Sequence, residues 1–261
     1  MPVGLEEILR STRGGLDGVR AGRAALERAA AARPPSPSFR DALRGPTVAV
    51  IAEVKRRSPS AGVIREDLDP GERAALYAEH GAAAISVLTD GPYFGGSMDD
   101  LRAASQRCTI PVLRKDFILD EVQILEARAA GAAAVLLIVR ALGHRLVPLL
   151  RFAAESGLDA LVEVHNHDEL SQALDAGATV VGVNSRDLDT FAIDMESALG
   201  IVARVPADCL VVAESGMAGQ PDVRRAAAAG ADAVLIGTAL SAAAAPGSLL
   251  RDLARVVRRG R

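Results

Sequence analysis

One pattern recurs along this chain: an Ala-rich segment, then a glycine, then a short apolar run. The glycines of the pattern are Gly81, Gly131, Gly157, Gly177 and Gly230. Glycine readily adopts the left-handed conformation that ends an α-helix. The apolar run that follows is typical of a strand buried on both faces of a parallel sheet. The pattern therefore predicts a series of units in which a helix is followed by a buried strand.

Three further apolar runs extend the series, at residues 48–54, 111–115 and 209–214. The interval between successive runs has room for one crossover helix. Eight such units in a chain of 261 residues predict an α/β fold of the (β/α)8 type, the TIM barrel. The alternative is a doubly wound open sheet, which usually carries a glycine-rich dinucleotide-binding turn after one strand. The sequence contains no such turn.

The segment before the first strand predicts an N-terminal helical extension. Residues 5–32 are rich in Ala, Leu, Arg and Glu and predict one or two helices, which the prolines within 34–37 end. Residues 39–43 predict a short helical turn. We therefore expect a single barrel domain over residues 1–261, of which residues 1–46 are the extension.

Charge and composition exclude several classes of protein. The formal net charge of −3 gives no overall attraction to nucleic acid or to anionic membranes. The basic segment 251–261 has apolar residues at helical spacing and predicts a solvated helix face. The two cysteines, Cys108 and Cys209, form no metal-binding or redox motif. No apolar run approaches the ~20 residues of a membrane span, and no signal-peptide pattern is present, so we expect a cytoplasmic protein.

Charged residues stand where the predicted strands end, which is where a (β/α)8 barrel has its active site. Glu53 and Lys55 lie two positions apart, and side chains at i and i+2 of a strand point to the same side. The other predicted strand ends carry Lys115, Glu163, Asn184, Arg186 and Glu214. We expect all of these groups to meet in one mouth. There, burial and the shared positive charge of Lys55, Lys115 and Arg186 would lower the lysine pKa values, and a closed site would raise the pKa of a catalytic glutamate.

The last two strand ends predict a phosphate site. Ser215 and Gly216 follow one strand, and Gly237 and Thr238 follow the next. Loops at this place in a barrel commonly bind a phosphate through backbone N–H groups. Glycine allows the backbone to approach such a ligand closely.

The residues alone leave the chemistry open. Two lysines allow Schiff-base catalysis or general acid catalysis, and carboxylates with a lysine also allow an isomerisation.

A possible metal site is formed by His165 and His167, followed by Asp168 and Glu169, but no third ligand is evident. We interpret this segment as a strand end followed by a capped helix, without a metal.

Five segments together resemble one family. They are IAEVKRRSPSAG (51–62), VLRKDFI (112–118), LVEVH (161–165), GVNSRDL (182–188) and VAESG (212–216). In this order and spacing they resemble the indole-3-glycerol phosphate synthases over nearly the whole chain. The resemblance implies a ring closure, with loss of carbon dioxide and water, that converts 1-(2-carboxyphenylamino)-1-deoxyribulose 5-phosphate into indole-3-glycerol phosphate in tryptophan biosynthesis. It also implies a monomer that needs no cofactor or metal.

The same resemblance implies roles for single residues. Lys115 matches the general acid, Glu163 the general base, and Lys55, beside Glu53, a lysine that contacts the substrate carboxylate and takes part in dehydration. Asn184 and Ser215 complete the implied catalytic set. The implied substrate-binding residues are Arg186, Glu214, Phe94, Phe117, Ser58 and Leu188. The implied phosphate-binding residues are Ser215, Gly216, Gly237 and Thr238.

Two other functions fit parts of the pattern. A phosphoribosylanthranilate isomerase needs a cysteine or aspartate acid–base pair at strand ends, whereas Cys209 precedes its strand and Glu53 and Lys55 hold the first strand end. A relative that only binds a phosphorylated metabolite would have lost a catalytic residue, and every implied one is present.

Overall fold

The computed structural model describes residues 4–260 and shows a closed barrel of parallel strands. The barrel closes because β1 pairs with β4 on one side and with β10 on the other. The strands are β1 (Ala49–Val54), β4 (Ala84–Leu88), β5 (Val112–Lys115), β6 (Ala134–Ile138), β7 (Asp159–Val164), β8 (Val180–Asn184), β9 (Leu210–Glu214) and β10 (Ala233–Ile236). The predicted (β/α)8 fold is confirmed, and the open-sheet alternative is wrong.

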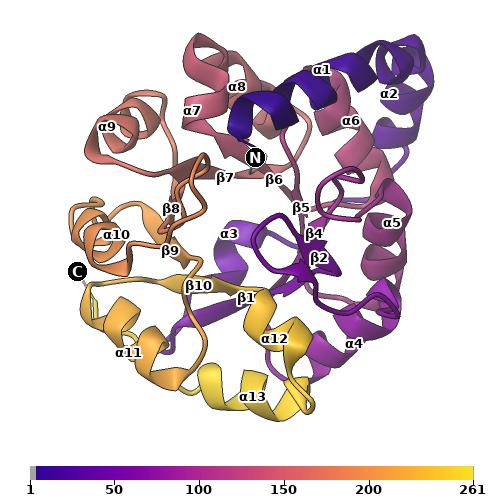
Figure 1. Cartoon of the computed structure of the whole chain (residues 1–261). Helices are drawn as coiled ribbons and strands as arrows, with labels where there is room; N and C mark the ends of the chain where they lie inside the picture. Colours follow the sequence, from indigo (N-terminus) through magenta and orange to yellow (C-terminus); the bar gives the residue numbers. More distant parts are fainter. Residues whose placement is uncertain (1–3, 261) are drawn as a thin grey trace.

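Helices surround the barrel and alternate with its strands (Figure 1). They are α4 (Pro70–Glu79), α5 (Met98–Arg107), α6 (Glu121–Ala130), α7 (Val139–Leu142), the short 3-10 turn η1 (Gly143–Arg145), α8 (Leu146–Glu155), α9 (His167–Asp175), α10 (Met195–Val202), α11 (Gln220–Ala228), α12 (Thr238–Ala242) and α13 (Pro246–Leu253). Gly131 follows α6 with φ of 94°, so it ends this helix in the left-handed conformation that the repeat predicts.

The strands are as deeply buried as the apolar runs predict. Every residue of β4, β6, β8, β9 and β10 is buried. Strands covered on both faces are the reason why the sequence shows continuous apolar runs rather than alternation. Within residues 4–260, no helix is both long enough and apolar enough to cross a membrane.

The N-terminal segment folds into α1 (Leu5–Ala21), α2 (Arg23–Ala31) and α3 (Phe39–Ala42), as expected. Figure 1 shows α1 and α2 outside the barrel beside α6, and both helices contact α6. The buried face of α1 is made by Leu5, Ile8, Leu9 and Leu16. The guanidinium of Arg20 donates to the carboxylate of Asp120 at 2.7 Å, so the end of α1 is tied to the loop before α6.

Two segments differ from the sequence-based expectation. The loop after β1 contains a two-stranded hairpin of β2 (Arg57–Ser58) and β3 (Gly62–Val63). The expected helix over 251–261 is wrong over residues 254–260, because α13 ends at Leu253, and residue 261 lies outside the described residues. Val257 instead forms an isolated bridge with Thr47, which precedes β1. The bridge with Thr47 pairs backbone N–H and C=O groups that would otherwise have been paired within a further turn of helix.

Candidate active site

A cavity of about 470 Å³ opens at the carboxyl ends of the strands, and every site residue that the sequence predicts lines it. These residues are Glu53, Lys55, Ser58, Phe94, Lys115, Phe117, Glu163, Asn184, Arg186, Leu188, Glu214, Ser215, Gly216, Gly237 and Thr238. They come from most of the strand ends, so the closure of the barrel brings them together. The expectation that the charged strand ends share one mouth is confirmed.

Lys115 lies between two carboxylates that come from other strands. Its Nζ is 3.6 Å from Oε2 of Glu163 and 3.7 Å from Oε2 of Glu214. Burial alone would lower the pKa of Lys115, but the carboxylates of Glu163, Glu214 and Glu53 outweigh burial and raise that pKa. The expected lowering is therefore wrong for Lys115, because the nearest charges are negative rather than positive.

The two glutamates beside Lys115 differ in their pKa. Burial and the neighbouring Glu163 carboxylate raise the pKa of Glu214 well above its usual range. Burial would also raise the pKa of Glu163, but the positive charges of Lys115 and His165 outweigh it and hold that pKa below its usual range. The expected upward shift is thus found at Glu214 and not at Glu163. Two carboxyl groups whose pKa values diverge can serve as a proton donor and a proton acceptor in one site.

Glu53 and Lys55 project into the cavity together, as their spacing predicts. Nζ of Lys55 lies 3.6 Å from Oε1 of Glu53. Burial lowers the pKa of Lys55, although Glu53 opposes the shift, and the charges of Lys115 and Arg186 add to it. A Cβ atom on Gly237 would lie 2.2 Å from Oε1 of Glu53, so only glycine at this position leaves room for the carboxylate.

The predicted phosphate loops lie side by side because β9 and β10 are neighbours in the barrel. Ser215 and Gly216 follow β9 with φ of 63° and 73°, and the chain therefore turns sharply at the cavity edge. A left-handed serine costs free energy, and such residues concentrate at binding and catalytic sites. Gly237 and Thr238 occupy the corresponding place after β10, where α12 begins.

Aromatic and aliphatic side chains form the apolar part of the cavity. The rings of Phe94 and Phe117 are 6.2 Å apart between centroids and tilted by 40°. Phe191, Ile193 and Met217 also line the cavity and are not among the site residues that the sequence predicts. Phe191 and Ile193 are large apolar residues in the same loop as Leu188, and their place after a predicted strand end is the signal that could have identified them.

Arg186 shapes the loop that carries these missed residues. Its backbone N–H donates to Oδ1 of Asn184 at 3.0 Å, and its guanidinium donates to the carbonyl of Phe191 at 2.9 Å. Arg186 also forms a bridge with Ile193. The loop after β8 therefore folds back over the cavity around this one arginine.

The hairpin of β2 and β3 covers another edge of the cavity. Oγ of Ser58 accepts a hydrogen bond from the N–H of Ala61 at 3.1 Å and is buried. Arg56 forms an ion pair with Asp100 at 2.5 Å, and Arg57 donates to the carbonyl of Pro92 at 2.7 Å. The bond from Arg57 attaches the hairpin to the loop that carries Phe94, and the ion pair attaches the residue before the hairpin to α5.

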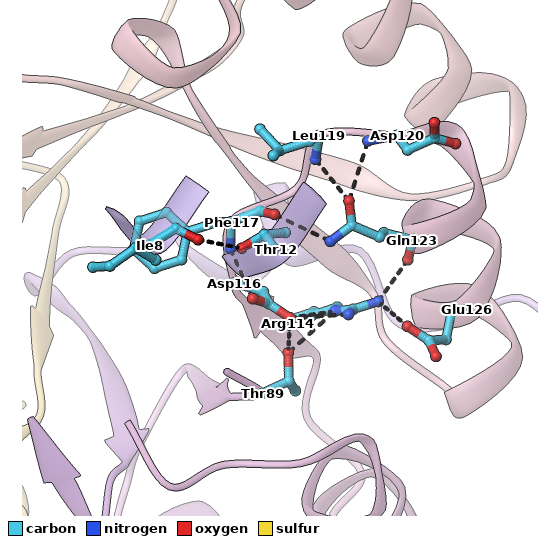
Figure 2. A network of polar contacts seen from close by, with 10 residues as sticks. All are labelled: Ile8, Thr12, Thr89, Arg114, Asp116, Phe117, Leu119, Asp120, Gln123 and Glu126. Carbon is cyan, nitrogen blue, oxygen red and sulfur yellow. Dashed lines mark hydrogen bonds and ion pairs between the residues drawn. The ribbon is translucent and has the colours of Figure 1, made fainter. Parts of the chain in front are cut away.

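A buried polar network supports the strand that carries Lys115 (Figure 2). Arg114 points away from the cavity and donates to Asp116 at 2.9 Å, to Glu126 at 2.8 Å and to the carbonyl of Gln123 at 2.7 Å. Oδ1 of Asp116 accepts from the N–H of Phe117 at 2.8 Å, and the amide of Gln123 donates to the carbonyl of Phe117 at 3.1 Å. The network fixes the turn after β5, and hence the positions from which Lys115 and Phe117 project.

The histidine pair after β7 follows the capped-helix interpretation. Oδ1 of Asn166 accepts from the N–H of Glu169 at 2.9 Å and caps α9. His167 is exposed at the first position of this helix. In the described part of the chain, no group of three or more His, Cys, Asp or Glu side chains has the arrangement of a metal site.

A closed barrel with acid–base groups, cations and small-residue loops at one mouth defines a (β/α)8-barrel enzyme that acts on a small anionic substrate. The sequence model of one family, indole-3-glycerol phosphate synthase, matches residues 5–253. The chain belongs to the indole-3-glycerol phosphate synthase family, the carboxy-lyases of tryptophan biosynthesis.

Individual relatives agree with the family assignment. Indole-3-glycerol phosphate synthase 2 of Streptomyces coelicolor is 51% identical over 231 residues, which cover 88% of this chain and 90% of the relative. Indole-3-glycerol phosphate synthase of a Parafrankia species is 49% identical over 261 aligned positions, covering 95% of this chain and 94% of the relative. A solved structure, thiamine phosphate pyrophosphorylase from Pyrococcus furiosus, matches with a TM-score of 0.60 and 19% identity over 81% of this chain and 95% of its own, and this similarity shows the fold alone.

Proposed function

We propose that this chain converts 1-(2-carboxyphenylamino)-1-deoxyribulose 5-phosphate into indole-3-glycerol phosphate, with release of carbon dioxide and water. The observation that carries the proposal is the position of Lys115 between Glu163 and Glu214, in the cavity that also holds Lys55 and Glu53. An acid, a base and a second cation in one cavity supply what ring closure, decarboxylation and dehydration need.

Lys115 is the proposed general acid. Its raised pKa keeps the ammonium protonated at neutral pH, so it is ready to donate to the ketone oxygen of the substrate. As the aromatic carbon attacks the ketone, negative charge develops on this oxygen, and a fixed cation stabilises that charge in a water-poor cavity. The proton moves when the alkoxide that forms is more basic than the amine of Lys115. A raised pKa of Lys115 in the resting enzyme therefore still allows it to act as the general acid.

Glu163 and Lys55 are proposed for the steps after ring closure. The low pKa of Glu163 keeps it ionised, and it is therefore able to accept a proton when water is lost. Lys55 pairs with the carboxylate of the substrate until that group leaves as carbon dioxide, and its lowered pKa then suits proton donation to the departing hydroxyl. Asn184, Glu214 and Ser215 line the cavity beside these groups and are proposed to complete the catalytic set.

The remaining cavity residues are proposed to hold the two ends of the substrate. Ser215, Gly216, Gly237 and Thr238 form the phosphate end through the two small-residue loops after β9 and β10. The other end is apolar, as an anthranilate ring requires, and Arg186 adds a positive charge near the mouth. The residues proposed to contact the substrate there are Phe94, Phe117, Leu188, Ser58, Arg186 and Glu214.

The proposal is tested by incubating the purified chain with the substrate and measuring both products. We expect one equivalent of carbon dioxide for each equivalent of indole-3-glycerol phosphate. Tight binding of the substrate without either product would indicate a protein that only binds the phosphorylated molecule. Neither binding nor turnover would contradict the proposal.

A further inference from the structure

A histidine next to Glu163, with most of its side chain shielded from solvent, has no part in the proposed chemistry. His165 follows β7 directly, and its ring lies between two carboxylates. Nε2 is 3.4 Å from Oε1 of Glu163, and Nδ1 is 3.2 Å from Oε2 of Glu169. The side chain of His165 is only 10% exposed, so both contacts are shielded from water.

Glu169 is held rigidly enough to fix one side of this ring. Its Oε2 accepts from the backbone N–H of His165 at 2.8 Å, and its Oε1 accepts from Nδ2 of Asn166 at 2.9 Å. The side chain is buried at the first turn of α9. A carboxylate in this position favours the proton on Nδ1 of His165, as in other groups where a third residue orients a histidine.

The opposite nitrogen is therefore the one that titrates. Nε2 of His165 is buried and makes no hydrogen bond within residues 4–260. A neutral Nε2 would place its lone pair against an oxygen of the Glu163 carboxylate, which is repulsive. One proton between Nε2 and Oε1 removes the repulsion and turns the contact into a charge-assisted hydrogen bond.

We infer that His165 is a positioning residue for Glu163: held by Glu169, it shares one proton with Glu163 and so orients that carboxylate and keeps it ionised. Oε1 of Glu163 then faces His165, while Oε2 faces Lys115 at 3.6 Å. The inference rests on the proposed function, because Glu163 has to be ionised only if it acts as the base.

The charges around His165 agree with this arrangement. Burial alone would lower the pKa of His165, but Glu169 and Glu163 outweigh burial and raise it. Arg140 on α7 opposes the rise, although its guanidinium pairs with Asp189. On the far side of Glu163, the charged and titratable groups are Lys115, from β5, and Glu214, from β9.

The first experiment follows the histidine rings by NMR without any substrate. The chain has four histidines, so ¹³C-histidine labelling gives a simple spectrum in which His165→Asn identifies the signal of His165. We expect this signal to titrate above the usual pKa of about 6.5. Glu163→Gln should lower the midpoint by about 1 pH unit or more, because an opposite charge at this distance shifts a pKa by that amount. An unchanged midpoint in Glu163→Gln would overturn the inference.

The second experiment measures both kcat and kcat/KM against pH, with His167→Asn as the matched control. His167 is exposed two residues further on and does not line the cavity. His165→Asn should lower kcat about tenfold and move the acidic limb upward by roughly 0.5–1 pH unit, since Glu163 loses a positive neighbour. His167→Asn should match the wild type. A fall in kcat without a shift of the acidic limb of the pH profile would make His165 a packing residue and overturn the inference.

If the wild type itself fails to turn over, the proposed function fails, while the NMR titration still decides whether His165 and Glu163 share a proton.

Discussion

A Cβ atom on Gly182 would lie 2.1 Å from Oε1 of Glu214. The two residues are on neighbouring strands, β8 and β9, where Gly182 pairs with Val212. Without a side chain at position 182, the Glu214 carboxylate reaches across β8 toward Lys115. The absence of one methyl group is therefore part of the geometry of the site.

Gly182→Ala should displace Glu214 and lower kcat by about tenfold or more. Overpacking of a core position of this kind costs about 1–3 kcal/mol of unfolding free energy. Gly200→Ala is the matched control, because Gly200 lies in α10 with open space around its Cβ position. The control should leave kcat unchanged and stabilise the fold slightly. Equal kcat values for both variants would show that the position of Glu214 does not matter.

The chain contains only two lysines, Lys55 and Lys115, and both line the cavity. ¹⁵N-lysine labelling therefore gives one NMR signal for each Nζ, with no surface lysines to overlap. The Lys55 signal should titrate below the usual pKa of about 10.4, and Lys115 should keep its proton to higher pH than free lysine does. A lower pKa for Lys115 than for Lys55 would contradict the placing of Lys115 among carboxylates.

Glu214→Gln should stabilise the fold at neutral pH while lowering activity. The pKa of Glu214 is higher in the folded chain than in the unfolded one, so the folded chain holds this proton more tightly. The free energy of unfolding therefore falls as the pH rises from the pKa of the unfolded chain through the pKa of the folded chain. The variant should match the wild type near pH 4 and exceed its Tm by about 2–4 °C at pH 8, which for a chain of this size corresponds to about 1 kcal/mol. The exposed Glu155→Gln is the control. A Tm difference that does not grow with pH would contradict the raised pKa.

Arg114→Met should destabilise the fold by about 3–5 kcal/mol, because it leaves the Asp116 carboxylate, which is only 9% exposed, without its cation. The comparison variant is Arg102→Met, which removes an exposed pair with Asp99 and should cost no more than about 0.5 kcal/mol. Denaturant unfolding measures both values. Similar small losses would show that the network in Figure 2 does not hold the β5 turn.

The fold was predictable because its signal is repeated. Each glycine and apolar run carries the same information about one helix end and one buried strand, so an ambiguity at one unit is corrected by the others. Segments outside the repeat had no such support. The pairing of Val257 with Thr47 joins the two ends of the barrel, and local helical spacing after Leu253 does not reveal it.

The members of the site were predictable, but their charge states were not. Position at a strand end is enough to place Lys115 and Glu214 in the same mouth. The pKa of each depends on which carboxylates face it and at what distance, and that is set by the closure of the barrel and by small details such as Gly182. The direction of the Arg114 side chain was also not predictable from its place in the sequence. Arg114 neighbours Lys115 in sequence, but points to the opposite side of the strand.

The most direct test of the account is the turnover of Lys115→Met compared with that of the wild type, with substrate and no added metal or cofactor. The chain contains no tryptophan, so the fluorescence of the indole product is read against a low background. We predict a rising signal for the wild type and a rate at least about 100-fold lower for the variant, since general acid catalysis contributes about 10²–10⁴-fold. Thermal unfolding checks that the variant is folded. A folded Lys115→Met chain that turns over within a few-fold of the wild type would contradict the assignment of Lys115 as the acid.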